Sequence, residues 1–400
     1  MAVVTIITAV RVLLALVLQS GRFAIPRCFW RTGVFLGRPM IVKFGIVPSM
    51  AFCLVLTANA QDFSGQLPPS DASQAEALAQ LNQFAEVSKA NFEKIENIQA
   101  DGVVFETTLQ EPCEYLTYVG DDERKIDGPL IESRESEISI AIDLKSDSFF
   151  IRQHESKPSR YRDFKSGKSV DVKVKSGVIR YRSYSNAVAT PEHVLQRRPF
   201  SDRGIRADDV GEQRFFTRAA PKSLEASVSL DPRTEICSQT WFNPEMLNGL
   251  VAAVEKRQFI VWTETVGDKV IIRGMSNEGV QPHYEITFDK SIGGFVTSVD
   301  RSSIIAGRRS TSADRFRYEK IVDTYVPVEI LQTNRTVESI DFPDEKKIVL
   351  KNVKLNQPLA ENQFTWQVLE PQDGDHLDDK IQKKQKVFSG GKPCDPAVIQ

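Results

Sequence analysis

The sequence predicts a mainly β protein of the α+β class, with a strongly curved antiparallel sheet, or incomplete β-barrel, of about a dozen strands. Two amphipathic helices are expected to cover its concave face. Apolar and polar residues alternate in most segments beyond residue 100, as in strands with one buried face and one wet face. Only two segments have helical spacing of apolar residues. A sheet of this length usually curls, and helices over the hollow would enclose an apolar cavity.

The first helix is expected to run from Asp71 to about Ile98. Asp71 and Gln74 have the spacing of a capping box, which satisfies the free amides at a helix start. The apolar residues that fall on one face at helical spacing are Leu78, Leu81, Ala85, Phe92 and Ile95. This helix needs a partner surface to cover that face.

Strands follow up to about residue 190. Alternation is clearest in Ile138–Leu144 and Val170–Val174, and Ser176-Gly177 is expected to turn the chain into Val178–Tyr184. Residues 191–235 are expected to be an insertion of long loops with little sheet.

The second helix has a clear start. Asn243 is the expected cap, and Pro244 takes the first helical position, where its missing N–H has no cost. Phe242 can staple onto Leu247. The expected apolar stripe is Leu247, Leu250, Val251 and Val254.

The remainder is expected to form strands up to about residue 355. Gly267-Asp268 is a hairpin turn signal between the first two of them. The expected strands are Phe259–Thr265, Val270–Met275, Tyr284–Phe288, Phe295–Val299, 314–322, 326–333 and 346–355. Residues 71–380 are interpreted as one domain, and 381–400 as a disordered tail.

An export signal is expected at residues 40–60. Lys43 precedes a short apolar run, and cleavage after Ala60, in the small-x-small sequence Ala-Asn-Ala, would leave Gln61 as the first mature residue. Residues 61–70 then form a linker. The exported chain is expected to have no stable transmembrane anchor and to work in the periplasm or cell envelope.

Two alternatives remain open in this leader. Cys53 could be lipidated, although Phe52 occupies a position where a lipoprotein signal needs a small residue, so plain cleavage is favoured. Residues 1–39 are either an upstream extension that is not translated, with Met40 as the true start, or a membrane anchor.

Charge and cysteine content narrow the class of protein. Six of the 51 Lys and Arg and none of the 53 Asp and Glu precede residue 61, so the exported part has a net charge of −8. This balance argues against a nucleic-acid partner, which would favour a basic excess. Cys113, Cys237 and Cys394 remain after cleavage, and Cys113–Cys237 is the candidate disulfide, with unpaired thiols as the alternative.

No catalytic constellation, metal site or cofactor motif is found in the sequence, so the protein is expected not to be an enzyme. The histidines lack metal-ligand spacing and are expected in turns or on the surface: His154, His193, His283 and His376. The acidic run 373–379 could bind Ca²⁺, but a solvated turn is the favoured interpretation. A basic group could meet anionic headgroups or form a wet strand face: Arg308, Arg309, Arg315 and Arg317.

Two C-terminal segments carry a family resemblance. "YEKIVDTYVPVEI" (318–330) and "VKLNQPLAENQFTWQVLEPQDGDHLDD" (353–379) contain a Val-Pro after a turn, then Asn356-x-Pro358 and Phe364. In this respect the chain resembles the bacterial lipoprotein carriers with the periplasmic LolA-like fold. The resemblance implies an incomplete β-barrel lidded by helices, an apolar interior for acyl chains, and no catalytic residues.

These observations predict an exported, non-enzymatic protein that holds a lipid or lipidated protein in an apolar cavity between sheet and helices. The candidate cavity-lining residues are Trp241, Trp262, Phe288, Trp366, Leu247 and Leu250. The same aromatics could instead be plain core. The alternative function is then a structural or protein-interaction module of the envelope with a filled core and no ligand. A hydrolase that uses scattered carboxylates is a third, weaker hypothesis.

Overall fold

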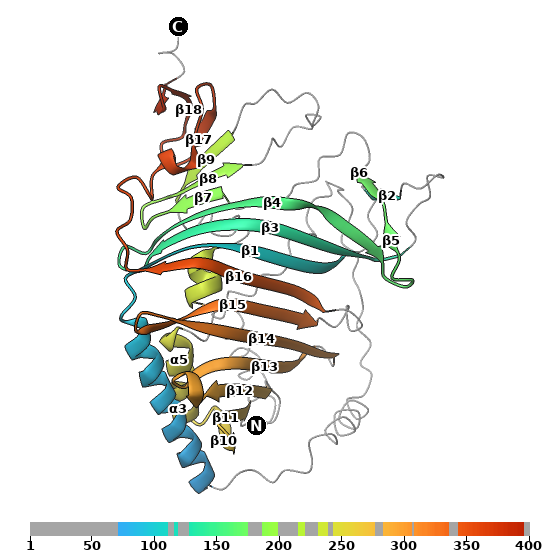
Figure 1. The fold of residues 1–400 in the computed structure, drawn as a ribbon, viewed down its shortest axis with the longest axis vertical. Helices are drawn as coiled ribbons and strands as arrows, with labels where there is room; N and C mark the ends of the chain where they lie inside the picture. The colour runs from blue at the N-terminus through green and yellow to red at the C-terminus, as the bar shows by residue number, and fades with distance from the viewer. Residues whose placement is uncertain are drawn as a thin grey trace, which may run out of the picture. The chain divides into compact units, whose positions relative to one another are not determined.

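Strand β1 (Asn97–Gln110) lies at the centre of one long sheet in the computed structural model (Figure 1). It pairs antiparallel with β3 (Leu130–Asp143) on one side and with β16 (Asp344–Leu355) on the other. The structure describes residues 71–110, 116–118, 128–174, 186–198, 215–220, 231–238, 243–276, 283–305, 308–335 and 343–395. All of them belong to one unit, residues 66–400. The expected export signal, with Ala60 and Gln61, lies outside the described residues.

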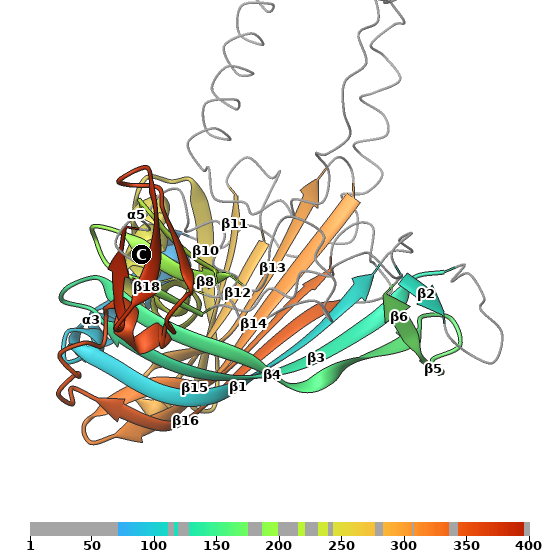
Figure 2. The same cartoon turned by 90° about the horizontal axis from the view of Figure 1, so that it is seen from above.

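On the β16 side, consecutive antiparallel neighbours continue the sheet to its edge. In order from β16, these strands are β15 (Thr324–Arg335), β14 (Arg308–Ile321), β13 (Phe295–Ile305), β12 (His283–Asp289), β11 (Lys269–Ser276) and β10 (Phe259–Val266). Figure 2 shows how the strands fan and bend around a concave face. The sheet stays open and is not closed into a barrel.

On the β3 side, β4 (Ser148–Asp163) pairs at one end with β7 (Asn186–Ala189) and at the other with β5 (Ser169–Val170). The pairing then continues through the last part of the chain, and β9 and β17 lie parallel. In spatial order from β7, these strands are β8 (Val194–Arg198), β9 (Phe215–Ala219), β17 (His376–Asp379), β18 (Lys384–Ser389) and β19 (Lys392–Cys394). A separate small sheet joins β2 (Leu116–Tyr118) and β6 (Val172–Val174).

Two helices pack on each other and on β10: α3 (Asp71–Phe92) and α5 (Pro244–Glu255). Asn243 caps α5 as expected, because its Oδ1 accepts a hydrogen bond from the Glu245 amide at 2.9 Å. The apolar face of both helices lies in one core with the concave face of the sheet. This face is called the inner face below, and the opposite one the outer face. The mainly β, curved-sheet prediction with two covering helices is confirmed.

Three short helical turns complete the described elements. These are η3 (Arg233–Ser238), η4 (Lys290–Ile292) and η5 (Trp366–Leu369). No helix among the described residues is long and apolar enough to cross a membrane.

Some boundaries differ from the expectations. Helix α3 ends at Phe92, earlier than the predicted Ile98, because the chain turns there and Ile95 and Ile98 are buried from the turn and from β1 instead. Residues expected as loops or tail contain β8, β9, β18 and β19. The described residues form 19 strands in two sheets, more than the expected dozen, because several are only two to five residues long.

The turn between β14 and β15 contains a strained residue. Val322 has φ +58° and is 87% exposed, and a β-branched side chain is disfavoured in this left-handed region. We expect Val322→Asn to raise the free energy of unfolding by about 1 kcal/mol, because asparagine tolerates this conformation. Chemical denaturation measures the change, and Val266→Asn, at an exposed position of β10, serves as the control. No gain over that control would contradict the assigned turn.

Candidate functional site

The predicted site lies where α3 and α5 cover the inner face of the sheet. Phe288 of β12 and Leu247 of α5 are fully buried there, and Leu250 packs against the same core while remaining partly exposed. Phe288 stacks on Phe84 of α3, with ring centroids 4.2 Å apart and an interplanar angle of 10°. The structure therefore places these three predicted residues in one apolar core, in which the Phe84 ring fills the space against Phe288.

The other predicted residues lie elsewhere. Val261 of β10 points into the inner core, so Trp262, the next residue, faces the opposite side of the strand. Trp366 belongs to a second core on the outer face, under the C-terminal segment. Trp241 lies outside the described residues. The six residues are thus not gathered around one hollow, and their role in ligand binding stays a prediction.

Two asparagines hold the C-terminal end of α3. The side chain of Asn91 bridges to β15, because its Nδ2 donates to the Tyr325 carbonyl at 2.8 Å and its Oδ1 accepts from the Tyr325 amide at 2.9 Å. Asn356 lies in the turn after β16, and its Nδ2 donates to the Lys94 carbonyl while its Oδ1 accepts from the Glu96 amide, both at 2.7 Å. The Asn-x-Pro motif noted in the sequence thus fixes the link between α3 and β1.

Close contact between α3 and the sheet depends on Gly294. Its φ is +85°, and a Cβ built on it would lie 3.0 Å from Cδ1 and Cε1 of Phe84. Gly267 has φ +60° and open space around the same position. Substitutions at the two glycines therefore allow the effect of backbone strain to be separated from the effect of a collision with α3.

We expect Gly294→Ala to lower the thermal midpoint more than Gly267→Ala does. Both substitutions force alanine into the left-handed region, at about 1–2 kcal/mol. Only the first also pushes Phe84 off Phe288, which loosens α3. Differential scanning calorimetry gives the midpoints. Equal decreases in the thermal midpoint would show that Phe84 of α3 does not contact this position.

Away from the helices, the inner face becomes polar and its charges are paired. Lys346 of β16 contacts Glu235 of η3 at 2.9 Å, and Arg301 contacts Asp314 at 2.8 Å. Burial raises the pKa of Asp314, and the positive charge of Arg301 opposes that shift. In the described residues, the inner face thus has an apolar part beneath the helices and a charged part in which these acidic and basic side chains pair with each other.

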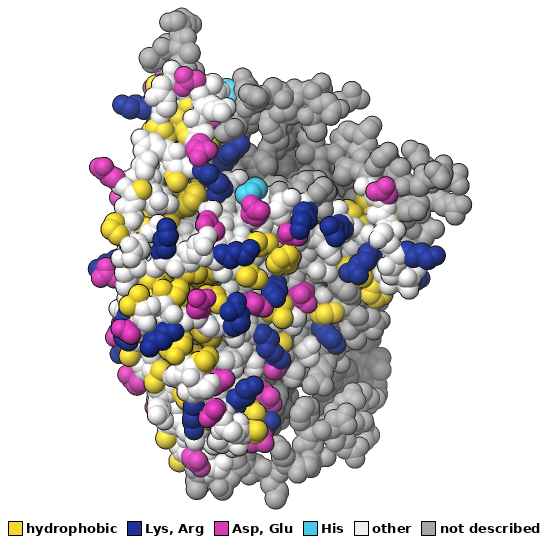
Figure 3. Space-filling model, in the orientation of Figure 1, with side chains coloured by type: hydrophobic (Ala, Val, Ile, Leu, Met, Phe, Trp, Pro, Cys, Tyr) yellow, Lys and Arg dark blue, Asp and Glu magenta, His cyan; other side chains and the backbone are white. Residues whose placement is uncertain are grey.

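Two arginines of the basic group noted in the sequence, Arg315 and Arg317, lie on the outer face. Arg315 contacts Asp300 at 2.7 Å, and Arg317 contacts Glu329 at 3.3 Å. Figure 3 shows this face, where basic and acidic side chains are interspersed across the strands. Such pairing is typical of a wet strand face.

The predicted disulfide is not tested, because Cys113 lies outside the described residues. Cys237 belongs to η3 and is buried in the inner core, and burial raises the pKa of its thiol to about 12. Cys394 ends β19 and is partly exposed.

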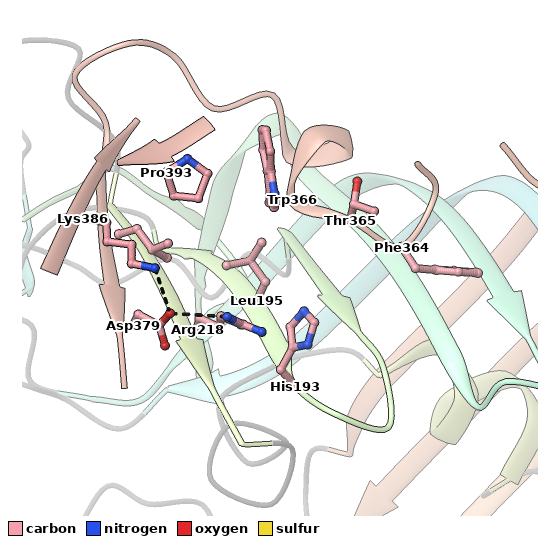
Figure 4. A pocket seen from close by; sticks show the side chains of 10 residues that line it. His193, Leu195, Arg218, Phe364, Thr365, Trp366, Asp379, Lys386 and Pro393 are labelled. Atoms are coloured by element: carbon pink, nitrogen blue, oxygen red, sulfur yellow. Dashed lines mark hydrogen bonds and ion pairs between the residues drawn. The ribbon is translucent and has the colours of Figure 1, made fainter. Parts of the chain in front are cut away.

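A second candidate site is a cavity of about 270 Å³ on the outer face of β8, β9 and β17 (Figure 4). The segment 364–366 covers it. Its polar residues are His193, Arg218, Thr365, Asp379 and Lys386, and its apolar ones are Leu195, Phe364, Trp366, Leu377 and Pro393. Sequence reasoning named only Trp366 as a site residue here. Leu377 and Asp379 are two residues apart and so share one face of β17, which is the one signal in the local sequence. The parallel pairing of β9 with β17, which brings Arg218 next to Asp379, joins segments far apart in the sequence.

Three carboxylates of the acidic run 373–379 accept hydrogen bonds within the protein, and that of Asp373 accepts from the Gly391 amide at 3.4 Å. Asp375 is 2% exposed and accepts a hydrogen bond from the Gln372 amide at 2.7 Å. Asp379 accepts from the Ile381 and Gln382 amides at 3.1 and 3.0 Å. The hydrogen bonds of Asp375 and Asp379 are those that such side chains make in tight turns.

The fold and the inner face define an open curved-sheet protein whose concave side is covered by helices. No family model matches the chain, and no curated protein matches it.

Solved structures to which the chain is similar include a DUF1329 family protein from Desulfovibrio piger, at 10% identity and TM-score 0.32, covering 74% of this chain and 99% of that one. An outer membrane lipoprotein-sorting protein domain from Vibrio parahaemolyticus has 10% identity and TM-score 0.26, covering 72% and 99%. A lipovitellin structure has 9% identity and TM-score 0.25, covering 67% and 26%. Likenesses at these TM-scores assign no function, so the proposals below rest on the geometry of this chain.

Proposed function

We propose that this is an exported, non-enzymatic protein of the bacterial envelope that binds a lipid or lipidated protein against the inner face of its sheet. One observation carries the proposal. A continuous apolar surface runs across the inner face from β10 through β1 to β9, and α3 and α5 cover part of it. On an open sheet with such a surface, an acyl chain can replace a covering helix, because both present apolar groups to the sheet.

Ligand entry requires α3 to separate from the sheet, because the Phe84–Phe288 stack fills the space below it. Each buried methylene of an acyl chain contributes about 0.8 kcal/mol, so a long chain can offset the loss of contacts made by the helix. Since Asn91 and Asn356 hold the C-terminal end of α3, the helix would pivot there. Leu250 of α5, already partly exposed, would lie near the opening.

Photo-crosslinking from α5 tests the proposal directly. A photoreactive phenylalanine analogue at Leu250 should capture a lipid or lipidated protein in the envelope of the native host. The same analogue at Phe105, 39% exposed on the outer face of β1, is the matched control. Native mass spectrometry of the purified protein then identifies the adduct. Absence of any adduct, of co-purifying lipid and of a thermal shift with fatty acids would reject lipid binding.

The filled core favours a second candidate, a structural or protein-interaction module without a ligand. Phe288 and Leu247 have no exposed surface, as in an ordinary core. Hydrogen exchange separates the two candidates. The carrier requires α3 amides to exchange through an opening that leaves β1 protected, whereas the module requires α3 and β1 to open together.

A further inference from the structure

The cavity on the outer face is independent of the proposed lipid site. Neighbouring residues of β9 point to opposite sides of the sheet: Ala219 lies in the inner core, and Arg218 lines the cavity. Because of this separation, the inner site can fail its test without affecting the cavity.

The walls of the cavity are largely apolar and well supported. Trp366 packs on Phe388, with ring centroids 5.6 Å apart, and Phe388 packs in turn on Phe216 at 5.3 Å. Phe388 and Phe216 are 1% exposed. The indole is thus fixed by the core behind it. A volume of about 270 Å³ is just below the range of about 300–1,000 Å³ that is usual for ligand sites, so it suits a small molecule.

One end of the cavity has a positive excess. Asp379 is fully buried, and its Oδ2 lies 3.4 Å from Arg218 Nη1 and 3.9 Å from Lys386 Nζ, as drawn in Figure 4. Its other oxygen, Oδ1, accepts two backbone amides of the following turn. Among the described residues that line this end, one carboxylate therefore faces two cations, which is an excess of one positive charge.

An unused donor lies at the same place. The Nε of Arg218 is buried and donates to no group in the part of the chain that the structure describes. A buried donor without a partner is costly, so an acceptor at this position would be stabilised. His193 is half-buried beside it, and burial together with the Arg218 charge lowers the pKa of its imidazole. His193 is therefore neutral at pH 7 and adds no second positive charge.

We propose that this cavity binds a small amphipathic monocarboxylate, with its carboxylate at Arg218 and Lys386 and its apolar part against Trp366 and Leu195. A single negative charge matches the single positive excess, whereas a phosphate dianion would exceed it. The remaining walls are mainly apolar, so they favour an apolar body over a hydrophilic one. A turn of the guanidinium into the cavity would let the bound carboxylate accept the Nε–H that Arg218 now leaves without a partner.

Calorimetric titration of the folded protein with octanoate tests the proposal. We expect saturable binding, and octanol, which lacks the charge, should bind about tenfold or more weakly. Lys386→Gln and Arg218→Lys should each weaken octanoate binding by about tenfold. The second variant keeps the positive charge beside Asp379 but removes the Nε donor. Lys392→Gln, an exposed lysine on the neighbouring β19, is the matched control and should bind octanoate unchanged.

Equal affinity for octanoate and octanol would overturn the proposal, because the charged end would then have no role. Failure of octanoate to bind a protein with an unchanged thermal midpoint would also overturn it. Should Arg218→Lys not fold, Lys386→Gln and the octanol comparison still decide the outcome.

Discussion

Phe288→Ala should lower the free energy of unfolding by about 3–5 kcal/mol, the cost of removing a large aromatic side chain from a core. Phe288 has no exposed surface and stacks on Phe84, so its loss leaves a void between β12 and α3. Neighbouring strands on both sides of β12 hold the sheet in place and limit collapse around the void.

Urea denaturation followed by circular dichroism measures this loss. Phe105→Ala is the control, because Phe105 is 39% exposed on the outer face, and its loss should cost less than about 1 kcal/mol. If the carrier proposal holds, Phe288→Ala also opens space under α3 and increases the uptake of a fluorescent fatty acid. A Phe288→Ala protein as stable as the Phe105→Ala control would contradict the assigned core.

Asn91→Ala should lower the free energy of unfolding by about 2–4 kcal/mol. The substitution removes both bonds to Tyr325 and leaves a backbone donor and acceptor of β15 unsatisfied, at about 1–3 kcal/mol each. Asn91 is only 6% exposed, so water replaces it poorly. Hydrogen exchange of the α3 amides should accelerate more than that of β1.

Asn82 provides the control on the same helix. It is exposed, and within the described residues its side chain donates to the Leu78 carbonyl of its own helix alone. Alanine is the better helix former, so Asn82→Ala should be neutral or slightly stabilising. Asn91→Asp keeps the acceptor but loses the donor, so its free energy of unfolding should lie between those of Asn91→Ala and Asn82→Ala. Equal exchange rates in Asn91→Ala and Asn82→Ala would show that Asn91 does not hold the helix.

Features encoded by neighbouring residues were predictable from the sequence. The cap and the proline at the start of α5 lie next to each other, and the two strands around Gly267 are joined by their own turn. The curved, helix-covered sheet follows from many such local patterns. The central position of β1 does not follow from local patterns, because its partners are set by packing between distant segments and not by its own alternation.

The candidate sites were less predictable for the same reason. Sequence reasoning grouped Trp262, Phe288 and Trp366 by residue type, but the side of the sheet on which each one lies depends on strand register and on the path of the C-terminal segment. The outer cavity needs Arg218 and Asp379 side by side through a parallel pairing that no local pattern indicates.

The placement of β1 also determines when the fold can be completed. Val104 is translated early, and its neighbour in the sheet, Ile348, comes near the end of the chain. Until β16 emerges, one edge of β1 has no strand to bond with, so a chain that folds as it emerges would carry an adhesive edge for most of its synthesis. Such an edge can pair with another chain, and folding as a whole should be slow, as in proteins dominated by distant pairings.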